Sequence, residues 1–265
     1  MLLAIDSGNT NLVFAVMQGE QVLAQWRMET NDRRTADEYF VWLSHLAASK
    51  GLDVGKFAAV IIANVRPASQ FALDRLCHEY LGLRPLVVGR EPCRFDLEVK
   101  VTSPEQVGAD RLVNAFAAKH LIGGPAILID TGTATTLDIL DAQGAYAGGI
   151  IAPGVHVSAQ ALANAAAQLP LVPVEQPASP IGTDTRSAIQ SGLYWGYISL
   201  LEGLIERTKA AMRSQGHASR GQAICVLGTG GLIRTLNQNM TALDRVESDL
   251  TLIGLREIYR LNQKS

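Results

Sequence analysis

The feature that most constrains the fold is a motif that occurs twice, about half a chain apart. The first copy, LLAIDSGNT, runs from Leu2 to Thr10, and the second, AILIDTGTA, runs from Ala126 to Ala134. In each copy an apolar strand ends in an aspartate, a hydroxyl residue and a glycine. Such a strand-to-turn junction places a carboxylate and several backbone N–H groups at one point, which suits a metal-bound phosphate chain. The repeat therefore predicts a duplicated domain that binds a nucleotide.

The bulk composition fits a compact protein and argues against several classes of partner. The 265 residues are 48% hydrophobic and 18% charged, and the formal net charge is -2. This balance gives no indication of nucleic acid or an anionic membrane as a partner. No apolar run approaches the ~18 residues that span a bilayer, so we expect a cytoplasmic protein with no membrane segment. The three cysteines are widely spaced and predict neither a disulfide framework nor a zinc site.

The expected elements follow the same order in the two halves. The first half is expected to contain strands at 2–5, 12–17 and 21–28, a helix from a capping box at Thr35 to Gly51, a strand at 58–63, a helix at 69–81 and a strand at 86–88. The second half is expected to contain strands at 126–130, 135–140, 145–150 and 223–227 and helices near 155–168, 184–212, 231–238 and 250–261. Four prolines between Leu169 and Ile181 predict an extended loop on the surface.

The first copy of the motif allows two interpretations. Asp6 stands where the first strand ends, and Gly8 allows a turn that points the N–H groups of Asn9, Thr10 and Asn11 inward, toward an anion. An ordinary polar hairpin turn has the same residue types.

The second copy favours the phosphate interpretation. Asp130 follows the apolar run Ile-Leu-Ile, and a carboxylate at such a position needs polar partners or a cation. The hydroxyl groups of Thr131, Thr133, Thr135 and Thr136 are suited to phosphate oxygens or a cation, although the preference of threonine for strands explains the last two equally well.

A third motif, Gly108-Ala109-Asp110-Arg111, lies between the two copies at the start of an expected helix. Asp110 and Arg111 are neighbours on that helix and project in different directions. One can therefore act as a base while the other binds a carboxylate. The alternative is a carboxylate that interacts with the helix dipole, beside a solvated arginine.

Further glycine-rich junctions at 148–154 and 182–185 are suited to line a small-molecule pocket, or to serve as turns with N-caps. No two of the five histidines have the spacing of metal ligands, and His156 is the one that lies near these glycines. It is therefore a candidate for contact with a substrate.

Together, these motifs resemble those of the type III pantothenate kinases, and the resemblance runs from Met1 to about Asn262. It implies an α/β fold with two ribonuclease-H-like domains of the acetate and sugar kinase, heat-shock ATPase and actin superfamily. The implied domains are 1–118, with the first phosphate loop, and 119–265, with the second loop, a cation site and the interface of a homodimer. The implied activity is ATP-dependent phosphorylation of pantothenate, the first step of coenzyme A synthesis.

The resemblance also implies roles for individual residues. Asp110 matches the proton acceptor, Thr133 a second phosphate contact, and Asp130 the ligand of a monovalent cation, potassium or ammonium. The implied ATP phosphate loop, in which Asp6 acts on Mg²⁺ directly or through water, consists of Asp6, Ser7, Gly8, Asn9, Thr10, Asn11, Leu12 and Val13. The implied pantothenate site consists of Val101, Gly108, Ala109, Asp110, Arg111 and Thr185. Residues 228–231 resemble the place where kinases of this architecture bring the backbone close to adenosine.

The chain departs from the family pattern at two places. Val101 stands where many members carry a tyrosine that contacts pantothenate, and the segment from Asn64 to Pro67 carries Arg66 in place of a small, uncharged residue. Two alternatives stay open. One is a non-enzymatic transcription accessory factor, because some relatives were first described as Bvg accessory factors. The other is a kinase or phosphohydrolase of the same superfamily with another acceptor.

Overall fold

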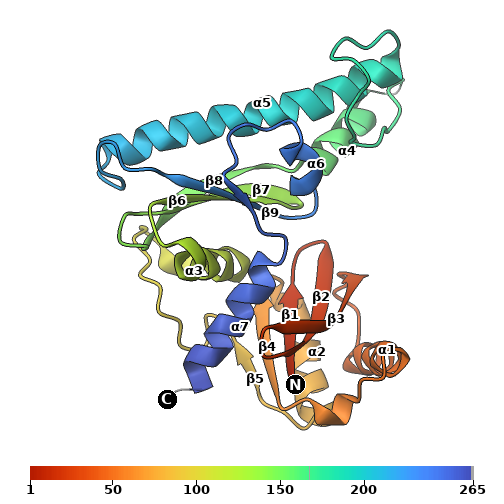
Figure 1. Ribbon diagram of the computed structural model, residues 1–265. Coiled ribbons are helices and arrows are strands. Elements are labelled where there is room, and N and C mark those ends of the chain that lie inside the picture. The colour runs from red at the N-terminus through yellow and green to blue at the C-terminus, as the bar shows by residue number, and fades with distance from the viewer. Residues whose placement is uncertain (167, 264–265) are drawn as a thin grey trace. The chain divides into compact units, whose positions relative to one another are not determined.

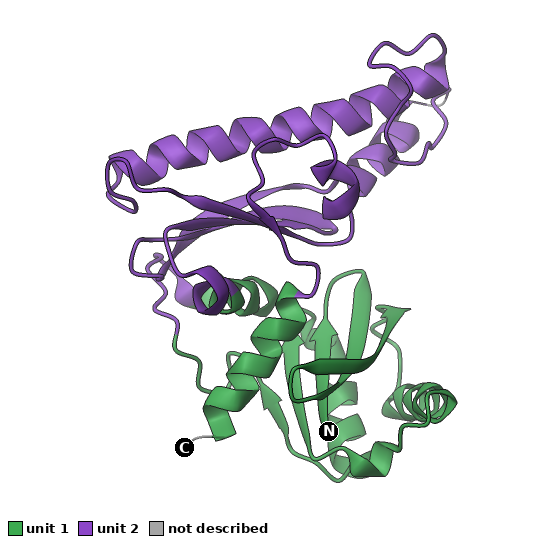
Figure 2. Cartoon of the chain, in the orientation of Figure 1, with its two compact units in different colours: residues 1–96, 105–117, 250–265 green, residues 97–104, 118–249 purple. Residues whose placement is uncertain are grey.

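The computed structural model describes residues 1–166 and 168–263 and divides the chain into two compact units (Figure 1, Figure 2). Unit 1 consists of residues 1–96, 105–117 and the described part of 250–265, and unit 2 consists of residues 97–104 and 118–249. The expected division between 118 and 119 does not coincide with these bounds. Residues 97–104 and Ala118 belong to unit 2, and the helix α7 (Leu250–Gln263) belongs to unit 1.

The sheet of unit 1 has the strand order β3-β2-β1-β4-β5. Its strands are β1 (Leu2–Ser7), β2 (Asn11–Gln18), β3 (Gln21–Glu29), β4 (Ala59–Asn64) and β5 (Pro85–Val87). The five expected strands are confirmed. β1 pairs antiparallel with β2 and parallel with β4, in a register that sets Ser7 opposite both Leu12 and Asn64. The turns that follow β1 and β4 therefore lie at the same edge of the sheet.

The helices of unit 1 bury the apolar side chains of this sheet. α1 (Ala36–Ser49) begins at the expected capping box, in which Glu38 N donates to Thr35 Oγ1 at 3.3 Å and Thr35 N donates to Glu38 Oε2 at 2.7 Å. α2 (Pro67–Arg75) begins two residues before the expected start, because proline fits the first turn of a helix. A π-helical turn (Leu76–Tyr80) continues it. Leu3 and Ile5 of β1 pack in one core cluster with residues of α1 and α2.

Unit 2 repeats the arrangement of unit 1, with the strand order β10-β9-β6-β7-β8. Its strands are β6 (Ala126–Thr131), β7 (Ala134–Leu140), β8 (Tyr146–Pro153), β9 (Cys225–Thr229) and β10 (Arg245–Val246). β6 pairs antiparallel with β7 and parallel with β9, as β1 does with β2 and β4. The predicted duplication is therefore confirmed. The two-residue strand β10 was not predicted, because its length is too short for an alternating pattern.

The remaining helices are α3 (Ala109–Ile122), α4 (Val155–Ala165), α5 (Thr185–Ser214) and α6 (Ile233–Asn237). α4 ends before 168, the expected end, and residue 167 of that span lies outside the described residues. α5 begins with a capping box between Asp184 and Ser187. The described helices include none that is both long and apolar enough to cross a membrane.

The proline-rich segment from Leu169 to Ile181 contains no helix or strand, as expected. It does not simply lie on the surface, however. Val172 and Val174 are only 4% and 8% exposed, and Val174 belongs to the core cluster of unit 2. The expectation of a surface loop was wrong for these two side chains, because apolar residues in an extended segment gain free energy when they are buried.

Candidate active site

The first phosphate-type loop connects β1 to β2 in unit 1. Gly8 N donates to Asn11 O at 3.0 Å and closes a tight turn, while Thr30 Oγ1 donates to Gly8 O at 2.8 Å. Asn9, Thr10 and Asn11 are exposed. The turn therefore presents three successive polar residues to a ligand. Thr30, the residue after β3, holds the turn in place through its hydrogen bond to Gly8.

The residues that flank this turn, at the end of β1 and the start of β2, differ from the turn residues in their burial. Leu12 and Val13 are buried in the sheet between β1 and β3, so their side chains are not available to a ligand. Asp6 and Ser7 point to opposite faces of β1, because successive side chains of a strand alternate. Ser7 is 0% exposed, and its Oγ lies 3.0 Å from Ser69 Oγ of α2. Asp6 is half-buried on the other face, where a carboxylate is suited to a divalent cation.

The Gly-Ala-Asp-Arg motif forms the start of α3 in unit 1. Arg111 N donates to Asp110 Oδ1 at 2.7 Å, and this contact fixes the carboxylate. Burial raises the pKa of Asp110 above its usual range, although the N–H group and the charge of Arg111 oppose the shift. A carboxylate with a raised pKa is a stronger proton acceptor than an ordinary aspartate.

Val65, which follows β4, connects this motif to the first loop. Val65 N donates to Ser7 O at 3.0 Å, and the Cγ1 atom of Val65 lies 3.7 Å from the position of a Cβ on Gly108. Within unit 1, the structure therefore brings together the end of β1, the end of β4 and the start of α3. Two of the motifs predicted from the sequence meet here, although about 100 residues separate them.

Arg66, for which the sequence offered no role, lies at the turn between β4 and α2. It is the N-cap residue of α2 and forms an ion pair with Asp32, while its N–H group donates to Asn64 Oδ1 at 2.8 Å. Its side chain therefore contacts the segment that follows β3.

The second loop connects β6 to β7 in unit 2 and lies against two glycines. Gly154 N donates to Thr133 O at 3.1 Å, and Thr131 Oγ1 donates to Thr229 O at 3.1 Å. A Cβ on Gly230, which has φ +92°, would lie 2.5 Å from Asp130 Oδ1 and from Thr131 N. The half-buried Asp130 carboxylate therefore lies next to the backbone of Gly230, which has no side chain. Backbone N–H and C=O groups surround this position.

The other two predicted pantothenate contacts also belong to unit 2. Lys100 N donates to Tyr146 O at 2.7 Å, and Val101 lies beside β8, with its Cγ1 atom 3.9 Å from the position of a Cβ on Gly148. Thr185 is the exposed first residue of α5. The predicted site residues are thus divided between the units, with Asp6 to Val13 and Gly108 to Arg111 in unit 1 and the remainder in unit 2.

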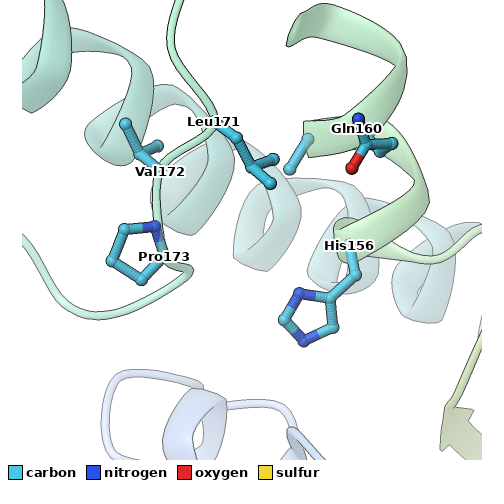
Figure 3. A pocket seen from close by; sticks show the side chains of 6 residues that line it. His156, Gln160, Leu171, Val172 and Pro173 are labelled. Carbon is cyan, nitrogen blue, oxygen red and sulfur yellow. The ribbon is translucent and has the colours of Figure 1, made fainter. Parts of the chain in front are cut away.

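A cavity of about 350 Å³ lies between α4 and the proline-rich segment in unit 2 (Figure 3). Its lining residues are His156, Ala159, Gln160, Leu171, Val172 and Pro173. His156 lies two residues after Gly154, whose N–H group donates to Thr133 O. The sequence marked His156 as a candidate but gave no signal for Gln160 or for Leu171 to Pro173. The lining of this cavity places the proline-rich segment next to α4, and the side chain of Val172 is buried there.

The donor groups fit the metal ions that the resemblance implies. No group of three or more His, Cys, Asp or Glu residues suited to a metal ion occurs in the described part of the chain. Mg²⁺ does not need one, because in kinases it binds one or two carboxylates together with substrate phosphates. Asp6 can supply such a carboxylate, and Asp130 offers a separate oxygen ligand at the second loop.

Comparisons with known proteins identify the family. The model of the family "Type III pantothenate kinase" matches residues 2–207. The type III pantothenate kinase of Caulobacter vibrioides is 48% identical over 264 residues, which cover 99% of this chain and 98% of that protein. That of Sphingopyxis alaskensis is 48% identical over 267 residues, which cover 100% and 99%.

Solved structures show the fold. A Campylobacter jejuni protein named as a Baf family transcriptional activator has a TM-score of 0.59 at 18% identity and covers 99% of this chain and 100% of its own. A Sinorhizobium meliloti protein named as a 2-dehydro-3-deoxygalactonokinase has a TM-score of 0.55 at 16% identity, with coverage of 98% and 96%. The chain therefore shares the α/β fold of these two proteins, with two five-stranded sheets. Since the family model spans more than half of its length, the chain belongs to the type III pantothenate kinase family.

Proposed function

We propose that the chain transfers the γ-phosphoryl group of ATP to the primary hydroxyl of pantothenate, yielding 4'-phosphopantothenate in the first step of coenzyme A synthesis. The observation that carries this proposal is the half-buried Asp110 carboxylate, which has a raised pKa. It lies at the start of a helix that Val65 connects to the first phosphate loop. A general base must take the hydroxyl proton as the oxygen attacks phosphorus.

The neighbouring groups of unit 1 divide the remaining tasks. Arg111 binds the carboxylate of pantothenate, because a guanidinium group suits bidentate recognition of a carboxylate. Residues 8–13 bind the phosphates of ATP through the turn and its backbone N–H groups. Gly108 and Ala109 leave room for the acceptor beside Asp110. These groups offset the charge of the transferring phosphoryl group without reorganisation during the reaction.

Two kinds of cation complete the proposed site. Asp6 would hold Mg²⁺, directly or through water, and Asp130 would hold a potassium or ammonium ion against the backbone near Gly230. Thr133 would contact the phosphates from the second loop. When bound, the cations neutralise phosphate charge. In unit 2, Val101 and Thr185 are proposed to contact pantothenate.

We also propose that the protein is a cytoplasmic homodimer that assembles through unit 2. Large apolar side chains stand exposed on β8, α4, α5 and the proline-rich segment, as expected of a surface that a second copy covers. They are Ile151, Val157, Leu162, Leu171, Ile181 and Leu200. Sedimentation of the wild type should give the mass of two chains, and Ile181→Asp together with Leu200→Asp should shift it toward one chain.

The activity is tested by measuring ADP formation with pantothenate, Mg²⁺ and either potassium or ammonium. Asp110→Asn should lose most of kcat while it still binds nucleotide. No turnover by the wild type with any cation would contradict the proposal. ADP formation at the same rate without pantothenate would instead indicate a phosphohydrolase or a kinase for another acceptor.

A further inference from the structure

Beyond the residues that resemble known site residues, we propose that Ser69 is a positioning residue for the first phosphate loop and acts through Ser7. The inference rests on the proposed function only in taking residues 6–13 as a nucleotide loop. Both hydroxyl groups are buried, with Ser7 0% and Ser69 3% exposed. Ser7 is the last residue of β1 and Ser69 lies in the first turn of α2, so their contact joins segments 62 residues apart.

The geometry determines the direction of this hydrogen bond. Ser69 Oγ lies 2.9 Å from Arg66 O and 3.2 Å from Asn64 Oδ1, and both of these oxygens can only accept. Asn64 Oδ1 already accepts the N–H group of Arg66 at 2.8 Å. Ser69 therefore donates its single proton within the turn after β4. The proton shared between the two serines, at 3.0 Å, must come from Ser7.

The role of Ser7 follows from this proton count. Its hydroxyl proton points into α2, so the side chain is not a donor to phosphate oxygens. It instead anchors the residue from which the loop begins, and Gly8 closes the turn immediately after it. Loss of the Ser69 hydroxyl would leave a buried donor on Ser7 without its acceptor, which favours displacement of the loop.

Ser69 is itself held rigidly. Asn64 Nδ2 donates to Gln70 Oε1 at 2.8 Å, and Gln70 Nε2 donates to Asp74 Oδ1 at 2.9 Å. The contacts thus form a continuous network from α2 through the turn after β4 to β1. In such buried networks each bond depends on the others. The network ends at Val65, which contacts Ser7 and lies next to Gly108. The network therefore also connects the loop to the Gly-Ala-Asp-Arg motif.

The test measures binding of Mg²⁺ with adenosine 5'-(β,γ-imido)triphosphate by calorimetry, which needs no acceptor. Ser69→Ala, Ser7→Ala and the double variant are compared with the wild type. The matched control is Ser44→Ala, because Ser44 Oγ of α1 is buried with no hydrogen-bond partner among the described residues. Ser69→Ala should raise Kd about tenfold, equivalent to ~1.4 kcal/mol, and Ser44→Ala should leave it unchanged.

The double variant separates positioning from a general loss of stability. If Ser69 acts through Ser7, the double variant should bind no more weakly than either single variant, whereas independent structural effects would add. In turnover assays, KM for ATP should rise while KM for pantothenate stays within about twofold. An unchanged Kd in Ser69→Ala, or additive losses, would overturn the proposal.

Two further outcomes are informative. If Ser69→Ala does not fold, the test uses Ser7→Ala only, because removal of either hydroxyl breaks the same hydrogen bond. An unchanged Kd in Ser7→Ala would then refute the positioning role of Ser69. If the wild type binds the analogue but does not phosphorylate pantothenate, the proposed function fails while the binding comparison still tests Ser69.

Discussion

Gly108 lies directly beside the Asp110 carboxylate: a Cβ on Gly108 would lie 2.5 Å from Asp110 Oδ1. Real Cβ atoms do not approach another heavy atom this closely, so a larger residue would force the carboxylate to move. The same Asp110 oxygen accepts the N–H group of Arg111 at 2.7 Å. Gly108 therefore has to be a glycine if the Asp110 carboxylate is to keep its position.

Gly108→Ala should consequently lower kcat by about 10²-fold, because a shift of about 1 Å in a catalytic group has an effect of this size. KM for ATP should change little, since the first loop is untouched. Steady-state kinetics with both substrates measure the two effects. Gly192→Ala in α5 is the control, because a Cβ there would meet no described atom within 4 Å. Wild-type kcat in Gly108→Ala would show that the carboxylate tolerates displacement.

The raised pKa of Asp110 predicts the pH dependence of catalysis. The base acts when deprotonated, so kcat/KM for pantothenate should fall as the pH drops through its pKa. This limb of the profile should lie above the usual range of an aspartate, because burial raises the pKa. The charge of Arg111 opposes that shift, so Arg111→Met should move the limb to still higher pH. A wild-type profile that stays flat down to the ordinary aspartate range would remove Asp110 from this role.

The same carboxylate should reduce the stability of the folded chain. The folded-state pKa lies above the unfolded value, so the folded state binds this proton more tightly. The contribution to stability is therefore present below the unfolded pKa and is lost as the pH rises through the folded pKa. Asp110→Asn removes the charge but keeps an acceptor for the Arg111 N–H group. At neutral pH it should have a higher Tm than the wild type.

A thermal unfolding series checks this second consequence of burial. The Tm difference between Asp110→Asn and the wild type should shrink as the pH falls toward the unfolded-state pKa, because both side chains are then neutral. A difference that stays constant with pH would mean that the carboxylate is not what destabilises the fold. A lower Tm for the variant at neutral pH would mean the same.

Local signals in the sequence predicted much of the fold. The capping box at Thr35 and the continuous apolar runs before Asp6 and Asp130 each act over a few residues, and the structure has the helix and both strands. The repeated motif predicted a duplicated domain, and the structure has two sheets whose strands follow equivalent orders. The Gly-Ala-Asp-Arg motif was predicted at the start of a helix, and α3 begins at its second residue.

The contacts that shape the site depend on partners far away in the chain. Nothing near Ser69 indicates that its hydroxyl group meets Ser7, because that contact exists only once β1 and β4 have paired. The burial of Val172 likewise depends on where the proline-rich segment folds back. Helix α7 follows the second half in sequence, yet packs with unit 1. Tertiary packing decides such features, and local propensity does not encode them.

Gly230 provides the sharpest test of the second loop. A methyl group there would lie 2.5 Å from both Asp130 Oδ1 and Thr131 N, and the φ of +92° disfavours any side chain. Gly230→Ala should therefore displace Asp130, lowering kcat at saturating potassium at least tenfold or raising the potassium concentration needed for half-maximal activity. Gly231→Ala is the matched control, because a Cβ on that neighbour would meet no described atom within 4 Å. Equal potassium dependence and kcat in the two variants would show that the backbone at Gly230 does not support a cation at Asp130.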